Sequence, residues 1–152
     1  MSKSNLLVIF QFVLFAVFAG LMFYLPTQQN FIWRIVALIV MLAGGIIGLV
    51  AINMHNSTNK NLPNISPEPQ QQSNLVTSGP YRYARHPIYT AVILVALGAA
   101  IFHGHILLFA LTIVFYAFFS YKSMHEESLL QAVYPDYPAY KEQTGRFFPG
   151  IK

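Results

Sequence analysis

Residues 6–25 read LLVIFQFVLFAVFAGLMFYL, a run of twenty residues without a charged side chain. At a rise of about 1.5 Å per residue, a helix of this length matches a bilayer core about 30 Å thick. Residues 31–52 form a second such run, with Arg34 near enough to one end to reach the headgroups. The two runs predict two membrane-spanning helices. We expect the first to be retained, because it is longer than the apolar core of a signal peptide and no convincing cleavage site follows it.

Two shorter apolar runs, residues 88–102 and 106–121, flank the sequence His103-Gly104-His105. Runs of about 15 residues are short for a straight span, so they predict a helical hairpin that turns at Gly104. The length of 152 residues is typical of one domain, residues 1–152. The sequence therefore predicts an all-α integral membrane protein with about four membrane helices. In the second run, Gly44 and Gly48 have the spacing of close helix contacts, which we expect to form within the chain.

The composition agrees with a membrane protein. The chain is 55% hydrophobic and only 9% charged, with a mean hydropathy of +0.50, whereas ordinary soluble domains are about 25% charged. The net charge of +4 is too thinly spread for a nucleic-acid partner. The absence of cysteine excludes disulfides, thiolate metal sites and a cysteine nucleophile. Nothing in the sequence implies an oligomer.

Basic residues divide unevenly between the two ends of the predicted helices. Four crossings place eight of the nine basic residues on one side: Lys3, Lys60, Arg82, Arg85, Lys122, Lys141, Arg146 and Lys152. Only Arg34 lies near the other side, so the positive-inside rule assigns the basic side to the cytoplasm. Both termini, the loop of residues 53–87 and the C-terminal segment of residues 122–152 should therefore be cytoplasmic, with the C-terminal segment against the membrane surface.

The first polar motif is LVTSGPYRYARHPIY, residues 75–89. Pro87 disfavours helical backbone at His86 and suits the first position of the following helix. Arg85 and His86 should then sit at a helix N-terminus, where backbone N–H groups and the helix dipole favour an anion. Tyr89 could point back at the same spot. A belt of interfacial Tyr and Arg is the alternative, but it would not explain a His-Pro pair at a helix start.

The second polar motif is His125-Glu126-Glu127, at the end of the last apolar run. Carboxylates near a helix C-terminus oppose the helix dipole by roughly 0.3–1 kcal/mol each. A solvated helix end is the alternative, but this motif holds two of only five acidic residues. Because a hairpin returns the chain to its starting side, the two motifs should lie at one membrane depth.

Together the motifs offer an anion-binding helix end, carboxylates for an ammonium group or ribose diol, and aromatic faces for adenine or a cation. S-adenosylmethionine carries all of these features, but a phospholipid headgroup or a nucleotide is compatible with them too. A metal site is not expected, because His103 and His105 would lie on the far side of the membrane from His86 and His125.

The order of these motifs resembles the isoprenylcysteine carboxyl methyltransferase family and its phospholipid methyltransferase relatives. The shared pattern is Arg-His-Pro-x-Tyr, a hydrophobic stretch, then Glu-Glu, which residues 85–89 and Glu126-Glu127 match. The stretches YPDYPAY (134–140) and RFFPG (146–150), with the Pro-rich loop around 62–69, extend the resemblance over residues 60–152. Ala91 stands where many relatives have glycine.

The resemblance implies a helix bundle whose cytoplasmic end, closed by the C-terminal segment, holds S-adenosylmethionine and releases S-adenosylhomocysteine. The residues that it places around the cofactor are Tyr81, Arg85, His86, Pro87, Tyr89, Glu126, Glu127 and Tyr140. Arg85 and Glu127 are also the expected catalytic residues. The expected location is a bacterial inner membrane.

The implied reaction is methyl transfer to a membrane lipid or a lipidic small molecule. We favour O-methylation of a carboxylate on a prenylated or similar molecule, because Arg82, Arg85 and the positive helix end would attract an anion. N-methylation of a phospholipid amine is the alternative reaction. A non-enzymatic membrane scaffold or transporter component is the alternative of another class.

Overall fold

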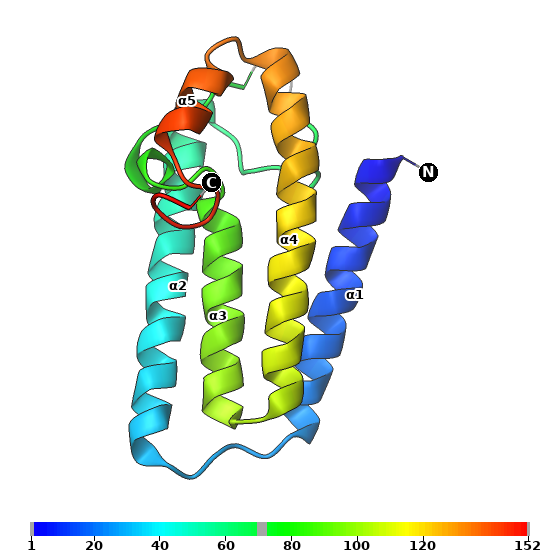
Figure 1. Cartoon of the computed structure of the whole chain (residues 1–152), viewed down its shortest axis with the longest axis vertical. Helices are drawn as coiled ribbons and strands as arrows, with labels where there is room; N and C mark the ends of the chain where they lie inside the picture. Colours follow the sequence, from blue (N-terminus) through cyan, green and yellow to red (C-terminus); the bar gives the residue numbers. More distant parts are fainter. Residues whose placement is uncertain (1, 70–72, 152) are drawn as a thin grey trace.

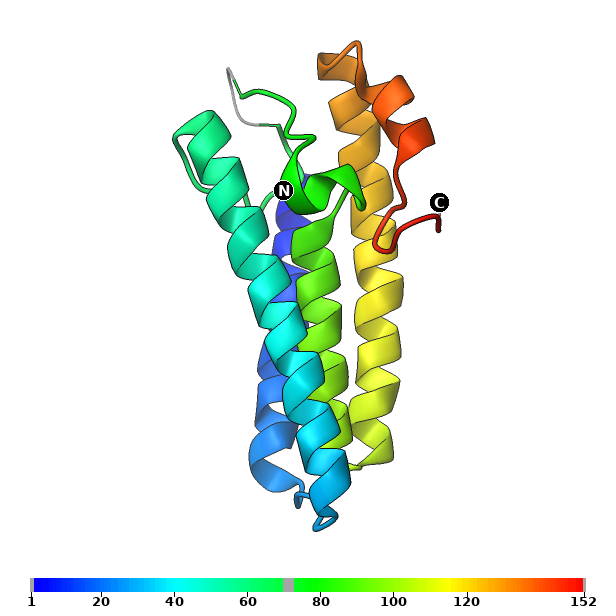
Figure 2. The ribbon, with the colours of Figure 1, turned by 90° about the vertical axis from the view of Figure 1, so that its left-hand side faces the viewer.

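The computed structural model describes residues 2–69 and 73–151, in which four long helices run side by side along the long axis (Figure 1 and Figure 2). They are α1 (Lys3–Tyr24), α2 (Phe31–Asn59), α3 (Pro87–His103) and α4 (Ile106–Val133). The short 3₁₀ helix η1 (Gly79–Arg82) precedes α3, and α5 (Tyr137–Gln143) follows α4. Three residues of the predicted loop, 70–72, and residues 1 and 152 of the predicted domain lie outside the described residues. The predicted all-α class is confirmed.

Three helices, α1, α2 and α4, are long and apolar enough to cross a membrane, and α3 is a shorter apolar helix of 17 residues. Their outward faces carry large apolar side chains. Phe12 on α1, Ile39 on α2 and Ile113 on α4 are 52%, 60% and 69% exposed. Lipid is the solvent that such faces require, so the chain is a multi-pass membrane protein.

Two helices extend beyond the predicted spans. Helix α2 continues past residue 52 to Asn59, so the predicted loop begins at Lys60. Helix α4 continues past residue 121 to Val133, which makes the first part of the predicted C-terminal segment helical. The placement of Glu126 and Glu127 near a helix C-terminus was therefore wrong. They lie inside α4, because their charges are balanced by partners from other segments and not by solvent at a helix end.

The hairpin between α3 and α4 turns at Gly104, as predicted. Its φ of 65° is left-handed, a conformation that glycine adopts without steric strain. The two histidines beside it serve the turn: His103 is buried with Nδ1 3.2 Å from the Leu25 carbonyl oxygen, and His105 accepts a hydrogen bond from the Leu107 N–H. The loop between α1 and α2 is thereby attached to the hairpin.

Helices α2 and α3 pack closely through the two glycines of the predicted motif. A Cβ atom at Gly44 would lie 2.9 Å from the Ala91 carbonyl oxygen, and one at Gly48 would lie 3.1 Å from the Ala91 Cβ. The expected contact within the chain is confirmed. Ala91 is accommodated because the opposing residue Gly48 has no side chain.

This contact gives a prediction with a matched control in the next residue. Gly44→Ala should lower the free energy of unfolding by about 1–3 kcal/mol, the usual range for overpacking. A Cβ atom at Gly45 would meet no atom of another described segment within 4 Å, so Gly45→Ala should be neutral or stabilising by up to about 1 kcal/mol. Unfolding of both purified variants in mixed micelles measures the difference. Equal stabilities would show that α2 and α3 can separate without loss.

Most of the segments outside the apolar helices gather at one end of the bundle. The start of α1, the end of α2, η1, α5 and the last described residues all lie at this end, whereas the hairpin turn and the α1–α2 loop lie at the other (Figure 1). The described parts of the two terminal segments and of the long loop therefore lie at the same end, as predicted. We call this end of the bundle the polar end.

Candidate active site

The start of α3 is fixed by local sequence and by the C-terminal segment together. Pro87 is the first residue of α3, and His86 precedes it with backbone outside the helical region, as predicted. The backbone N–H of Arg85 donates to the Gly145 carbonyl at 2.9 Å, and that of His86 donates to the Arg146 carbonyl at 3.1 Å. The C-terminal segment therefore lies directly against the predicted motif, although about sixty residues of chain separate them.

A cavity of about 390 Å³ opens at the polar end, within the usual size range of ligand pockets, about 300–1,000 Å³. All four long helices, the loop after α2 and α5 contribute to its walls. Seven of the eight predicted site residues line it: Tyr81, Arg85, His86, Pro87, Tyr89, Glu126 and Tyr140. The structure thus brings the two motifs together as expected. Glu127 is not among the cavity-lining residues.

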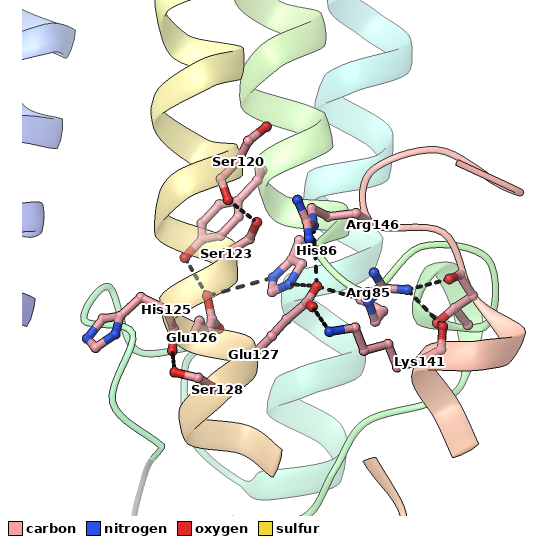
Figure 3. Close-up of polar contacts among 12 residues, drawn as sticks. Arg85, His86, Ser120, Ser123, His125, Glu126, Glu127, Ser128, Lys141 and Arg146 are labelled. Atoms are coloured by element: carbon pink, nitrogen blue, oxygen red, sulfur yellow. Dashed lines mark hydrogen bonds and ion pairs between the residues drawn. The ribbon is translucent and has the colours of Figure 1, made fainter. Parts of the chain in front are cut away.

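Glu127 lies outside the cavity lining, in a cluster of charged side chains (Figure 3). Its side chain is 2% exposed, and its Oε1 lies 3.0 Å from Arg85 Nε, 3.3 Å from His86 Nε2 and 3.5 Å from Arg146 Nε. Its Oε2 lies 2.9 Å from Lys141 Nζ. We call these five residues the Glu127 cluster. A buried carboxylate is tolerated only when it is paired in this way.

Arg85 is committed to the same cluster. Besides its contact with Glu127, its Nη1 donates to the backbone carbonyls of Lys141, at 3.1 Å, and Thr144. Its side chain is only 1% exposed. The guanidinium group therefore joins α4 to the end of α5, and it borders the cavity while holding the C-terminal segment in place.

Glu126 lies on the side of the His86 ring opposite to Glu127. Its Oε2 accepts a hydrogen bond from the Tyr89 hydroxyl at 2.7 Å and lies 3.7 Å from His86 Nδ1. The His86 and Tyr89 rings are stacked, with centroids 5.4 Å apart. Neighbouring helix residues point about 100° apart, so Glu126 faces the cavity and Glu127 faces the C-terminal segment. His86 is thus held between two carboxylates.

Tyrosines form another part of the wall. The Tyr140 hydroxyl donates to the Tyr81 carbonyl at 2.7 Å. Burial, with smaller contributions from nearby charges, raises the pKa of Tyr81, Tyr137 and Tyr140 well above the ordinary value for a phenol. Their hydroxyls therefore stay protonated at physiological pH. Tyr137, which is 1% exposed and lines the cavity, was not among the predicted residues.

Lys122 is the second functional candidate that the sequence analysis missed. The sequence placed it with the cytoplasmic charges, but it is fully buried in α4 and lines the cavity. Its ammonium nitrogen lies 2.5 Å from Gln11 Oε1 on α1 and 2.7 Å from the Ile65 carbonyl oxygen. Two signals could have indicated this. Gln11 interrupts an apolar run, and Lys122 is four residues before Glu126, so the two share one helix face.

The histidines are dispersed. His125 points away from the Glu127 cluster (Figure 3), and His103 lies at the opposite end of the bundle. Within residues 2–69 and 73–151, no group of three or more His, Asp or Glu side chains could hold a metal ion.

Comparison with known proteins places this architecture in a family. The sequence model for phospholipid methyltransferases matches residues 32–137, which include both motifs, α3 and all of α4. The chain belongs to the phospholipid methyltransferase family.

Two individual proteins are similar to this chain. The cobalt-zinc-cadmium resistance protein CzcN of Cupriavidus metallidurans is 31% identical over 83 residues, which is 54% of this chain and 38% of that protein. The fold is similar to that of the eukaryotic intramembrane Ras methyltransferase ICMT, an isoprenylcysteine carboxyl methyltransferase. That similarity has a TM-score of 0.70 at 24% identity and covers 99% of this chain. The chain spans 38% and 55% of the lengths of these two proteins.

Proposed function

We propose that the protein is an S-adenosylmethionine-dependent methyltransferase that acts on a lipidic acceptor. The observation that carries the proposal is one cavity lined by seven of the eight residues carried over from the methyltransferase motifs. The cavity is polar beside His86 and Glu126, and it has apolar walls from Phe15, Val92 and Phe119. A small polar cofactor and the end of a lipidic molecule can meet in such a space.

The residues present fit the cofactor. Glu126 presents a carboxylate, 25% exposed, for an ammonium group or a ribose diol. The start of α3 favours a carboxylate, and the buried tyrosines provide flat faces for adenine and sulfonium. When bound, S-adenosylmethionine supplies a methyl group already activated by its sulfonium. The chain must therefore align the acceptor and exclude water.

In this proposal Arg85 and Glu127 support catalysis by position. Their contacts hold His86 from one side and fix the C-terminal segment over the cavity. A carboxylate acceptor needs no general base, because it is already a nucleophile. An amine acceptor must lose a proton, and Glu126 or His86 would accept it.

For the acceptor we favour a carboxylate on a prenylated or similar lipidic molecule. Support comes from the fold of ICMT, whose name specifies a carboxyl methyltransferase, and from the excess of basic residues at the polar end. A phospholipid amine is the second candidate, and the name of the family model favours it.

Radiolabelled S-adenosylmethionine tests the proposal in two stages. Purified protein in detergent should bind the labelled cofactor saturably and then transfer the methyl label to a component of a bacterial lipid extract. A methyl ester releases the label as methanol in mild base, whereas an N-methyl group does not. Label found only in base-stable phospholipid would show that the acceptor is the amine and not the carboxylate. Absence of cofactor binding would favour a non-enzymatic scaffold or transporter component.

We also propose that the polar end faces the cytoplasm of a bacterial inner membrane, on the basis of the positive-inside rule. The chain has no cysteine, so single cysteines can be introduced without background labelling. Lys60→Cys, at the polar end, should react with a membrane-impermeant maleimide only after the cells are opened. Gln29→Cys, in the α1–α2 loop, should react in intact cells. The reverse pattern would invert the orientation.

A further inference from the structure

The cavity contains a buried cation that no step proposed above uses. Lys122 has no solvent-exposed surface, and its ammonium group lies 5.5 Å from the centre of the Tyr89 ring. Two oxygen atoms accept from it, the Gln11 carboxamide oxygen and the Ile65 backbone carbonyl. Both are neutral. Among residues 2–69 and 73–151, no carboxylate forms an ion pair with Lys122.

A buried ammonium whose hydrogen-bond acceptors are both neutral is electrostatically incomplete, and the Glu126 carboxylate acts on Lys122 through space without forming an ion pair with it. An ammonium has three N–H donors, and the described residues supply it with two oxygen acceptors. Burying a charge is unfavourable unless an opposite charge or a full set of hydrogen bonds compensates it. Lys122 borders the cavity, so an anionic group inside the cavity could provide the missing charge if the Gln11 carboxamide moved aside.

The position of Lys122 relates this cation to the proposed reaction. It lies one helical turn before Glu126, whose carboxylate contacts the Tyr89 hydroxyl, and the same Tyr89 ring lies beside the ammonium. Phe15 and Phe119 provide apolar surface in the same cavity. The cavity therefore offers a cation for an anionic head group and an apolar surface for a lipid tail, next to the residues assigned to the cofactor.

We propose that Lys122 is a specificity-determining residue that binds an anionic oxygen in the head group of the acceptor, either a carboxylate or a phosphodiester. The Gln11 carboxamide oxygen, 2.5 Å from the ammonium nitrogen, occupies the place that the anionic oxygen takes when the acceptor is bound. This inference rests on the proposed function, because it takes the bound anion to be part of the methyl acceptor. The anion site itself is testable without methyl transfer.

Thermal unfolding in a neutral maltoside detergent detects the site, because a ligand that binds the folded state raises the unfolding temperature. Palmitate tests a carboxylate, and dioleoylphosphatidylglycerol tests a phosphodiester. Hexadecanol and dioleoylglycerol are the uncharged counterparts of these two probes. We expect at least one anionic probe to stabilise the wild-type protein more than its uncharged counterpart. If neither does, the proposal is wrong.

Four variants assign the effect to Lys122. Lys122→Gln keeps hydrogen-bond donors and should bind the anionic probe about tenfold or more weakly, as expected for loss of a charge-assisted hydrogen bond. Lys122→Arg should retain binding. Gln11→Glu places a carboxylate beside Lys122 and should abolish probe binding while the fold persists. Lys3→Gln removes a charge at the exposed end of α1 and should bind the probe as the wild type does.

A purely structural role for Lys122 predicts a different pattern. If the lysine only attached α1 to α4, Gln11→Leu would lower the unfolding temperature and weaken probe binding as much as Lys122→Gln does. We expect Gln11→Leu to bind at least as tightly as the wild type, because it removes the competing oxygen. Binding of labelled S-adenosylmethionine, measured on the same samples, should be unchanged in Lys122→Gln. If the wild type does not bind the cofactor, the proposed function is wrong. If it binds the cofactor but neither anionic probe, only this inference is wrong.

Discussion

Replacing Glu127 with alanine is expected to lower the free energy of unfolding by about 3–5 kcal/mol, the range for removing one partner of a buried ion pair. The substitution would leave Arg85, Lys141 and Arg146 close together without their shared carboxylate. Arg85 is the most affected of the three, because its side chain is 1% exposed. Unfolding in mixed micelles, followed by circular dichroism, measures the change.

Glu142→Ala is the matched control for this substitution. Glu142 is an exposed carboxylate of α5, close in sequence to Lys141, and its loss should change the stability by less than about 0.5 kcal/mol. We also expect Glu127→Ala to make the C-terminal segment more sensitive to proteolysis, since that segment loses its charged contacts with α4. Equal stability of the two variants would contradict the structural role assigned to the Glu127 cluster.

The second large effect concerns the neighbouring carboxylate. Glu126→Gln is expected to weaken S-adenosylmethionine binding about 10- to 150-fold, the equivalent of one charge-assisted hydrogen bond of about 1.5–3 kcal/mol. Its stability should stay near that of the wild type, because the amide oxygen of the introduced glutamine can still accept from the Tyr89 hydroxyl. Equilibrium binding of the labelled cofactor to purified protein measures the affinity.

His86→Ala extends this prediction, because His86 contacts both carboxylates. It should weaken cofactor binding to a similar extent and also lower the stability. The informative contrast is between the two adjacent glutamates: the Glu126 substitution should affect binding alone, whereas the Glu127 substitution should affect folding first. Normal cofactor binding by folded Glu126→Gln and His86→Ala would remove these residues from the proposed cofactor site.

Local sequence was sufficient for the helices and for the position of the first motif. Apolar runs predicted the four helices, Pro87 predicted the start of α3, and Gly104 predicted the turn. Each of these features depends on backbone chemistry or on hydrophobicity within a few residues. The ordered motifs then indicated which side chains would share a cavity, and seven of the eight line it.

The length of α4 and the different positions of the two glutamate side chains could not be predicted in this way. Charged residues at 122, 126 and 127 look like the polar end of a span, yet Lys122 and Glu127 are buried. Their partners are Gln11 on α1 and Lys141 and Arg146 beyond α4. Pairing over such distances in the chain leaves no periodic pattern, and only the folded arrangement decides which carboxylate faces the cavity.

The hydrogen bonds from Arg85 and His86 to the carbonyls of Gly145 and Arg146 join the start of α3 to a segment that is synthesised later. When residue 146 emerges from the ribosome, all four long helices have already been synthesised and can enter the bilayer. The part of the cavity wall that Tyr137 and Tyr140 supply therefore has to dock onto helices that were made before it. A chain interrupted before this segment would hold the four long helices in the membrane but would lack a complete cavity. The complete cavity would form only after the segment had docked.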